Sequence, residues 1–166
     1  MSALLPKNKI IHFSGICGTG MGSLAVLLKL RGYEVRGSDD NVYPPMSDFL
    51  LQNNIIVLNG FSPKNINSEI DLVVIGNALS RGNPEIEKIL ESKIQYISMS
   101  ELLKTYFIFG KKSLVVTGTH GKTTTSSLLA WVFENAKLKP GFFIGGIAEN
   151  FSSSCRDGKG EFFITE

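Results

Sequence analysis

The feature that most constrains the fold of this chain is a glycine-rich loop between an apolar run and a helical pattern. Residues 113–117 form the apolar run, residues 118–125 read Gly-Thr-His-Gly-Lys-Thr-Thr-Thr, and a helical pattern covers residues 126–136. A loop of this kind turns backbone N–H groups toward an anion, and the helix after it adds a partial positive charge. The order of strand, glycine loop and helix therefore predicts an α/β domain with a phosphate site.

The side chains of this loop suit a nucleoside triphosphate. Lys122 supplies a mobile cation that reaches the outer phosphates, and the Thr123 hydroxyl lies where it can ligate Mg²⁺. The loop is shorter than the common pattern, because only two residues separate its first glycine from Gly-Lys. For His120, a backbone contact to phosphate is favoured over a catalytic imidazole. The expected nucleotide-binding residues are Gly118, Thr119, His120, Gly121, Lys122, Thr123 and Thr124.

A second glycine loop lies near the N-terminus. Residues 15–22 read Gly-Ile-Cys-Gly-Thr-Gly-Met-Gly between an apolar run and a helical pattern, which is the position of a Rossmann-type pyrophosphate loop. The match is imperfect, because Cys17 stands where the strict pattern has glycine. Asp39 ends the next strand, where an acidic group can accept from a ribose hydroxyl. We interpret the loop as a nucleotide diphosphate site; tight packing of strand against helix is the alternative.

Two further residues near this loop have competing interpretations. Cys17 is either a reactive thiol near a helix N-terminus or a small packing residue, and packing is favoured. His12 lies within an apolar strand pattern and is interpreted as structural.

Short apolar runs alternate with helical patterns along the first two thirds of the chain. The expected strands are 10–14, 34–37, 55–58, 72–75 and 95–97, and the expected helices are 21–31, 46–53, 84–92 and 99–106. This alternation predicts a parallel sheet with crossover helices. The pattern pauses after residue 109, which divides the chain into a Rossmann-like domain, 1–109, and the start of an α/β phosphate-loop domain, 110–166.

The second domain is expected to be cut short. After its glycine loop and helix, it should contain a strand at 142–144, a turn at Gly145-Gly146 and a final strand at 162–166. One helix and about three strands are too few to close a nucleotide-binding sheet, since such sheets typically have ~5 strands.

Composition excludes several classes of protein. Apolar residues at 43% and charged residues at 19% are typical of a soluble globular chain, and 17 basic against 15 acidic residues suggest no nucleic-acid or membrane surface. Cys17 and Cys155 show no metal-ligand spacing, and no run is long and apolar enough for a leader or a membrane span. We expect a cytoplasmic protein; the sequence sets no oligomeric state.

The two glycine loops together resemble those of the Mur ligases, the ATP-dependent enzymes that extend UDP-N-acetylmuramate by amide bonds in bacterial cell-wall synthesis. The shortened phosphate loop is that family's form. Segments 12–19, 37–47 and 75–84 resemble the branch that joins the murein tripeptide L-alanyl-gamma-D-glutamyl-meso-diaminopimelate to UDP-N-acetylmuramate in peptidoglycan recycling. The nearest alternative is the sister branch that adds L-alanine. The resemblance covers essentially the whole chain.

This resemblance implies ATP and Mg²⁺ as cofactors, with UDP-N-acetylmuramate and murein tripeptide as substrates. In the family, a carboxylate takes the terminal phosphate of ATP, and the incoming amine attacks the acyl phosphate. Lys122 is then catalytic because it neutralises charge on the transferred phosphoryl group, while Thr123 and Glu166 hold the metal. The UDP-sugar residues that the resemblance implies are Gly15, Gly18, Thr19, Gly20, Ser38, Asp39 and Asn77.

Parts of the family's active site are missing from these 166 residues, so the chain by itself is expected not to catalyse ligation. A nucleotide-binding module without catalysis is the alternative from another class. A nicotinamide-dependent oxidoreductase is disfavoured, because it rests on the first glycine loop alone and leaves Gly121-Lys122-Thr123 unexplained.

Overall fold

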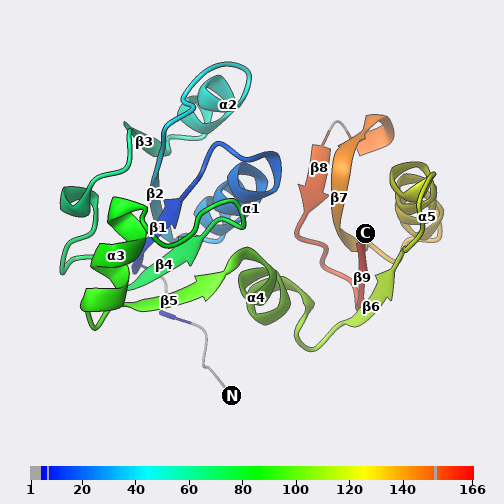
Figure 1. Cartoon of the computed structure of the whole chain (residues 1–166). Helices are drawn as coiled ribbons and strands as arrows, with labels where there is room; N and C mark the ends of the chain where they lie inside the picture. The colour runs from blue at the N-terminus through cyan, green and yellow to red at the C-terminus, as the bar shows by residue number, and fades with distance from the viewer. Residues whose placement is uncertain (1–4, 7, 152) are drawn as a thin grey trace. The chain divides into compact units, whose positions relative to one another are not determined.

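The computed structural model describes residues 5–6, 8–151 and 153–166. The chain forms two compact units, one ending at Leu102 and the other beginning at Leu103 (Figure 1). Helix α4, Met99–Leu103, continues into the π-helical turn η2, Lys104–Ile108. The division thus falls within this helical segment, whereas the sequence places the boundary after it, at residue 109.

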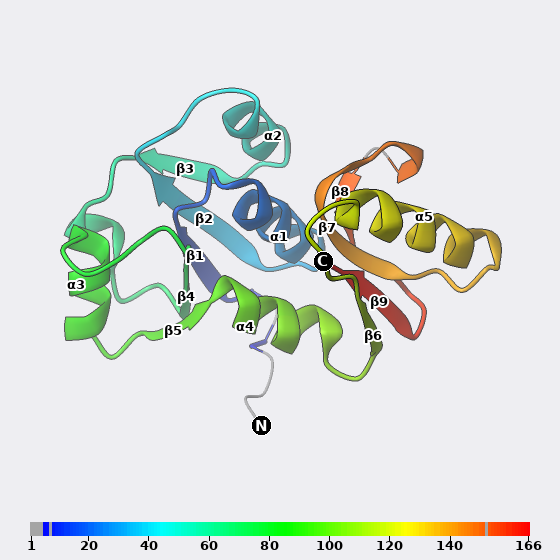
Figure 2. The same cartoon turned by 45° about the vertical axis from the view of Figure 1, so that its right-hand side comes forward.

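The N-terminal unit is built on a five-stranded parallel sheet in the order β3-β2-β1-β4-β5 (Figure 2). Its strands are β1 Ile10–Ser14, β2 Glu34–Asp39, β3 Ile56–Asn59, β4 Leu72–Ile75 and β5 Gln95–Ser98. Between them lie α1 Thr19–Leu30, α2 Met46–Gln52, the 3₁₀ turn η1 Pro63–Asn65 and α3 Pro84–Glu91. The predicted Rossmann-like α/β fold is confirmed for this unit.

The two faces of this sheet differ in chemistry. Along β1, Ile11 and Phe13 point to one face and are fully buried, while His12 and Ser14 point to the other. On the first face Gly37 of β2 is paired with Phe13, and a Cβ at this glycine would lie 2.5 Å from the Phe13 carbonyl oxygen. The loop after β1 therefore closes onto β2 only because residue 37 has no side chain.

Helix α3 covers part of the opposite face and has clear start signals. Asn83 caps it, because its Oδ1 accepts from the N–H groups of Glu85 (2.9 Å) and Ile86 (3.3 Å), and Pro84 occupies the first turn. Its apolar side packs into a buried cluster. The members of that cluster are Ile66, Ile70, Val73, Ile86 and Ile89. The cap and this packing fix the first turn of α3 over the sheet.

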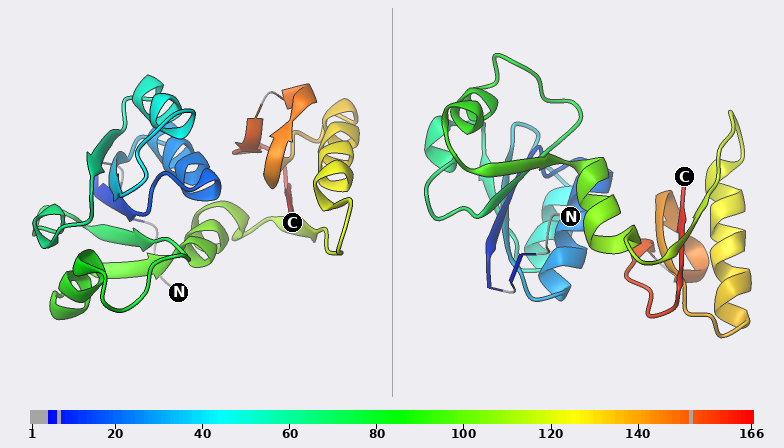
Figure 3. Two further views of the ribbon diagram at one scale, coloured as in Figure 1. Left: turned by 45° about the horizontal axis from the view of Figure 1, so that its top comes forward. Right: turned by 90° about the horizontal axis from the view of Figure 1, so that it is seen from below.

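The C-terminal unit has a four-stranded sheet in the order β6-β9-β7-β8 and one long helix, seen beside the sheet in Figure 3. Its elements are β6 Lys112–Val115, α5 Lys122–Asn135, β7 Gly141–Ala148, the turn η3 Glu149–Phe151, β8 Ser153–Arg156 and β9 Phe162–Thr165. Strands β6, β9 and β7 run parallel, and β8 is antiparallel to β7. The core contains Ala130, Phe142, Ile144, Ala148 and Ile164.

Three details of this unit differ from the sequence-based expectation. Gly145 and Gly146 lie inside β7 instead of forming a turn, and residues 153–156 form an unpredicted strand. Helix α5 begins at Lys122, four residues before the expected start at 126. Close approach favours both glycines: a Cβ at Gly145 would lie 2.7 Å from Glu166 Oε1, and one at Gly146 would lie 3.0 Å from the Thr123 methyl group.

Candidate functional site

The loop between β6 and α5 has the backbone of an anion-binding turn. Gly118 (φ +149°) and Gly121 (φ +74°) take positive φ values that favour glycine. Gly121 directly precedes α5, and no side chain caps this helix N-terminus. The first-turn N–H groups are thus left to face an anion.

Lys122 lies over this loop. Its Nζ donates to the carbonyl oxygen of Gly118 at 2.9 Å and approaches that of Thr119 at 3.5 Å. The ammonium therefore stays beside the residues expected to hold phosphate. His120 Nδ1 lies 3.2 Å from the hydroxyl of its neighbour Thr119, and within the described residues its imidazole forms no hydrogen bond to an acidic or basic side chain.

The two expected metal ligands lie together. The Thr123 hydroxyl donates to Glu166 Oε1 at 3.0 Å, and the Gly145 N–H donates to the same oxygen. The other oxygen, Oε2, is buried and has no hydrogen-bond partner. A hydroxyl beside a carboxylate with a free buried oxygen fits Mg²⁺, which takes few protein oxygens and completes its shell with phosphate and water. In the described ranges no cluster of three His, Cys, Asp or Glu forms a closed metal cage.

The first glycine loop is anchored on the end of β2. The N–H groups of Gly15 and Ile16 donate to the Ser38 carbonyl at 2.8 and 3.1 Å, and the Cys17 N–H donates to Asp39 Oδ2 at 2.9 Å. Gly15 has φ +85°, as this tight turn requires. The anchored half of the loop leads directly into the N-terminus of α1.

The exposed half of the glycine loop carries the backbone N–H groups that are open to a ligand. Gly18 and Thr19 are exposed, and α1 begins at Thr19 with no side-chain cap, so its first N–H groups are open. Across the sheet, Gly76 follows β4 and donates its N–H to the Ser14 carbonyl at 2.9 Å, which brings the exposed Asn77 to the same edge. Strand order reverses between β1 and β4, and ligands of open α/β sheets bind at such a point.

Asp39 and Ser38 are more enclosed than the sequence suggests. The Asp39 carboxylate also accepts from the Asn41 N–H at 2.9 Å, and Asp39 is only 8% exposed. Its hydrogen bonds therefore hold the glycine loop, at Cys17, and the loop after β2, at Asn41. Ser38 is fully buried. Its hydroxyl points into the sheet face below, away from the loop, and it reaches the glycine loop through its carbonyl.

The thiol of Cys17 is not activated. Burial and the nearby negative charge of Asp39 raise the pKa of Cys17 to about 11, so the group stays a neutral thiol near neutral pH. The raised pKa therefore supports the favoured interpretation of Cys17 as a packing residue.

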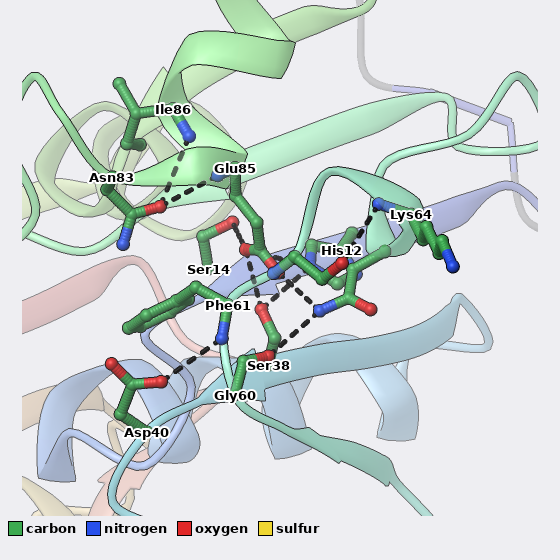
Figure 4. A network of polar contacts seen from close by, with 12 residues as sticks. His12, Ser14, Ser38, Asp40, Gly60, Phe61, Lys64, Asn83, Glu85 and Ile86 are labelled. Carbon is green, nitrogen blue, oxygen red and sulfur yellow. Dashed lines mark hydrogen bonds and ion pairs between the residues drawn. The ribbon is translucent and has the colours of Figure 1, made fainter.

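A buried polar network below the glycine loop was not foreseen (Figure 4). Glu85 Oε2 accepts from the hydroxyls of Ser14 and Ser38, each at 2.7 Å, and Oε1 accepts from Asn65 Nδ2 at 2.6 Å. His12 Nε2 lies 3.2 Å from the Ser38 hydroxyl and 3.7 Å from Glu85 Oε2. Burial opposes ionisation of Glu85, but the combined hydrogen bonds of its partners hold its pKa at about 2.

Comparison with known proteins identifies the family. A family model described as "Mur ligase family, catalytic domain" matches residues 10–108, more than half of the chain. The chain belongs to the Mur ligase family.

Relatives within the Mur ligase family cover nearly the whole chain. It is 46% identical over 156 residues to the UDP-N-acetylmuramate:L-alanyl-gamma-D-glutamyl-meso-2,6-diaminoheptandioate ligase of Escherichia coli (strain K12), covering 94% of the chain and 34% of that relative. It is 40% identical over 159 residues to the UDP-N-acetylmuramate:L-alanine ligase of Dictyoglomus turgidum, covering 95% of the chain and 33% of that relative.

A solved structure gives the same answer for the fold. The UDP-N-acetylmuramate:L-alanyl-gamma-D-glutamyl-meso-diaminopimelate ligase from Neisseria meningitides superposes with a TM-score of 0.89 at 43% identity, covering 96% of the chain and 52% of that structure. The chain thus spans about a third of the length of the curated Mur ligases it matches. None of its described helices is both long and apolar enough to span a bilayer.

Proposed function

We propose that this chain supplies the sugar-nucleotide domain and the phosphate loop of an ATP-dependent ligase that joins murein tripeptide to UDP-N-acetylmuramate in peptidoglycan recycling. The observation that carries the proposal is the 46% identity, over 94% of the chain, to the tripeptide ligase of Escherichia coli. The relative that adds L-alanine is less similar, at 40%. We also propose that the enzyme works in the cytoplasm, where ATP and sugar nucleotides are made.

The phosphate loop and its surroundings would serve the activation step. In the proposed reaction the substrate carboxylate attacks the terminal phosphorus of ATP, ADP leaves, and the amine of the tripeptide then displaces phosphate from the acyl phosphate. Lys122 would stabilise the negative charge that builds up on the transferred group. Thr123 and Glu166 would hold Mg²⁺, which in this class of reaction neutralises phosphate charge.

The open N-terminus of α1 would bind the diphosphate of UDP-N-acetylmuramate. Gly18, Thr19 and Gly20 present backbone N–H groups there, and Gly15 provides the turn. Asn77 would contact the ligand from the loop after β4. Asp39 and Ser38 would act mainly by holding the loop, because the Asp39 carboxylate accepts from the Cys17 N–H and the Ser38 carbonyl accepts from the N–H groups of Gly15 and Ile16.

Two alternatives remain distinct from this proposal. A ligase that adds L-alanine shares the phosphate loop, and a nucleotide-binding module would bind the same ligands without forming an amide. The complete enzyme separates them: tripeptide should be ligated and L-alanine should not, whereas the reverse preference assigns the chain to the sister branch. Absence of ligation with either amine supports the module.

A thermal-shift series on the chain tests the sugar-nucleotide site directly. A ligand that binds only the folded state stabilises it by roughly 2.7 kcal/mol at a concentration 100 times Kd. UDP-N-acetylmuramate should raise the midpoint of the N-terminal unit, and NADH at the same concentration should leave it unchanged. Stabilisation by NADH alone would reject the ligase assignment of this domain.

A further inference from the structure

Glu85 is a buried charge with no direct use in the proposed chemistry. It lies in the first turn of α3, is fully buried, and is held ionised by its neighbours. Well-packed apolar residues in place of a buried ionic network are often as stable or more stable. Stability alone is thus a weak reason to bury this carboxylate, and its partners indicate what else it does.

The side-chain donors to Glu85 lie at the ends of strands or in the segment that follows a strand. Ser14 is the last residue of β1 and precedes Gly15, and Ser38 precedes Asp39 at the end of β2. Asn65 ends the turn η1, which follows β3. One carboxylate thus connects the loops after three neighbouring parallel strands, and it comes from the helix that follows the fourth.

The main-chain carbonyls of the same serines accept hydrogen bonds from two loops of the site. The Ser38 carbonyl accepts from Gly15 and Ile16, and the Ser14 carbonyl accepts from Gly76. A hydroxyl fixed on Glu85 fixes the orientation of each serine. Glu85, buried beneath this edge of the sheet, therefore positions the two serine carbonyls that accept from the glycine loop and from Gly76.

Asn65 connects Glu85 to the loop after β3. Asn65 Nδ2 donates both to Glu85 Oε1 and to the Gly60 carbonyl at 3.0 Å, and the Gly60 N–H donates to the Asp39 carbonyl at 2.9 Å. The Ser62 N–H adds a longer bond to Oε1 at 3.4 Å. The loop after β3 is thus joined to the end of β2 in two ways: directly, by the main-chain bond from Gly60 to Asp39, and through Glu85, which accepts from both Asn65 and Ser38.

We propose that Glu85 is a positioning residue for the sugar-nucleotide site: as a carboxylate that only accepts hydrogen bonds, it holds the loops after β1, β2 and β3 in their ligand-binding arrangement without touching the ligand. This inference rests on the proposed function of the N-terminal unit. Glutamine has the same shape, but its amide group donates, so it cannot accept from both serines and Asn65 in the same arrangement.

The first test compares Glu85→Gln with a matched control, Glu87→Gln. Glu87 is on the same helix and also accepts from a side chain and an N–H, those of Arg81 and Gly82, but at the surface. Binding of UDP-N-acetylmuramate is measured by calorimetry at 10 °C, with circular dichroism confirming the fold. Kd should rise at least tenfold in Glu85→Gln and less than twofold in Glu87→Gln. A folded Glu85→Gln variant that binds within twofold of wild type overturns the proposal.

Hydrogen exchange of the ligand-free chain gives a second readout. The Gly15 and Ile16 amides should exchange at least tenfold faster in Glu85→Gln, because their local anchor is loosened. A purely structural role would accelerate the Val73 amide in β4 and leave the loop amides at wild-type rates, and that pattern would also overturn the proposal. If Glu85→Gln does not fold, Ser38→Ala removes one anchor, keeps the charge and is judged by the same two measurements.

The two proposals can fail separately. If the wild-type chain does not bind UDP-N-acetylmuramate, the function proposed for the N-terminal unit is rejected. The exchange experiment needs no ligand, so it still decides whether Glu85 holds the glycine loop.

Discussion

The pKa of Glu85 leads to a quantitative prediction about acid stability. The group titrates near 4.5 in an unfolded chain and at about 2 in the folded chain. A difference of about 2.5 units corresponds to roughly 3 kcal/mol of unfolding free energy, since each unit is worth about 1.36 kcal/mol. Because the folded pKa is the lower one, this stabilisation is complete above about pH 4.5 and is lost as the pH falls toward 2.

The Glu85→Gln variant isolates this contribution. Glutamine resembles the protonated acid, so the variant should be about 3 kcal/mol less stable than wild type at pH 7, and roughly 2 kcal/mol of that gap should close by pH 3. His12 Nε2 lies 3.7 Å from Glu85 Oε2, and both wild type and variant retain this histidine.

Urea unfolding at several pH values measures the gap. Far-ultraviolet circular dichroism follows both units, while the single tryptophan, Trp131, lies on α5 and reports the C-terminal unit alone. The tryptophan transition should be the same in wild type and variant. Glu87→Gln, at the surface, should change stability little at any pH. A Glu85→Gln gap that stays constant from pH 7 to pH 3 would refute the argument, because the carboxylate would then not be held ionised by its partners.

Three further changes test other parts of the structure. Gly37→Ala should destabilise the N-terminal unit by about 1–3 kcal/mol in thermal unfolding, because its Cβ would crowd the Phe13 carbonyl; unchanged stability would contradict the packing described. In the complete enzyme, Lys122→Ala should abolish amide formation and spare UDP-N-acetylmuramate binding, and loss of both would show that the two sites are not separate. Thr123→Val should raise the Mg²⁺ concentration needed for ATP binding severalfold in a titration, since it removes the hydroxyl beside Glu166.

The architecture of the N-terminal unit could be predicted from the sequence because its signals are local. Short apolar runs separated by helical patterns specify parallel strands and crossover helices without knowledge of distant contacts. The glycine loop at 15–22 and Asp39 were likewise visible, since their positions relative to the strands follow from chain order.

The features that the sequence did not predict depend on contacts between distant residues. Gly145-Gly146 has the composition of a turn, and the close approach of Glu166 and Thr123, which favours two glycines within this strand, is not visible in the sequence. Strand β8 is polar and is formed by pairing with β7. In both cases the local structure depends on contacts with residues that are distant in the sequence.

Glu85 escaped prediction for the same reason. A glutamate in the first turn of a helix is favoured by the helix dipole, so its type and position in the sequence are also typical of a solvated surface residue. The one available signal was opposite it in the fold: His12 and Ser14 are polar residues on one face of an otherwise apolar strand. Polar residues at alternate positions of a buried strand need partners, and the partner lay more than 70 residues away.

The convergence of donors on Glu85 also restricts how this chain can diverge during evolution. Losing the carboxylate alone would leave the hydroxyls of Ser14 and Ser38 buried without their acceptor, whereas changing acceptor and donors together to apolar residues of similar shape is nearly neutral. Relatives with an apolar residue at position 85 should therefore also lack hydroxyls at positions 14 and 38. The three positions are expected to change as a set, each single step passing through a less stable ancestor.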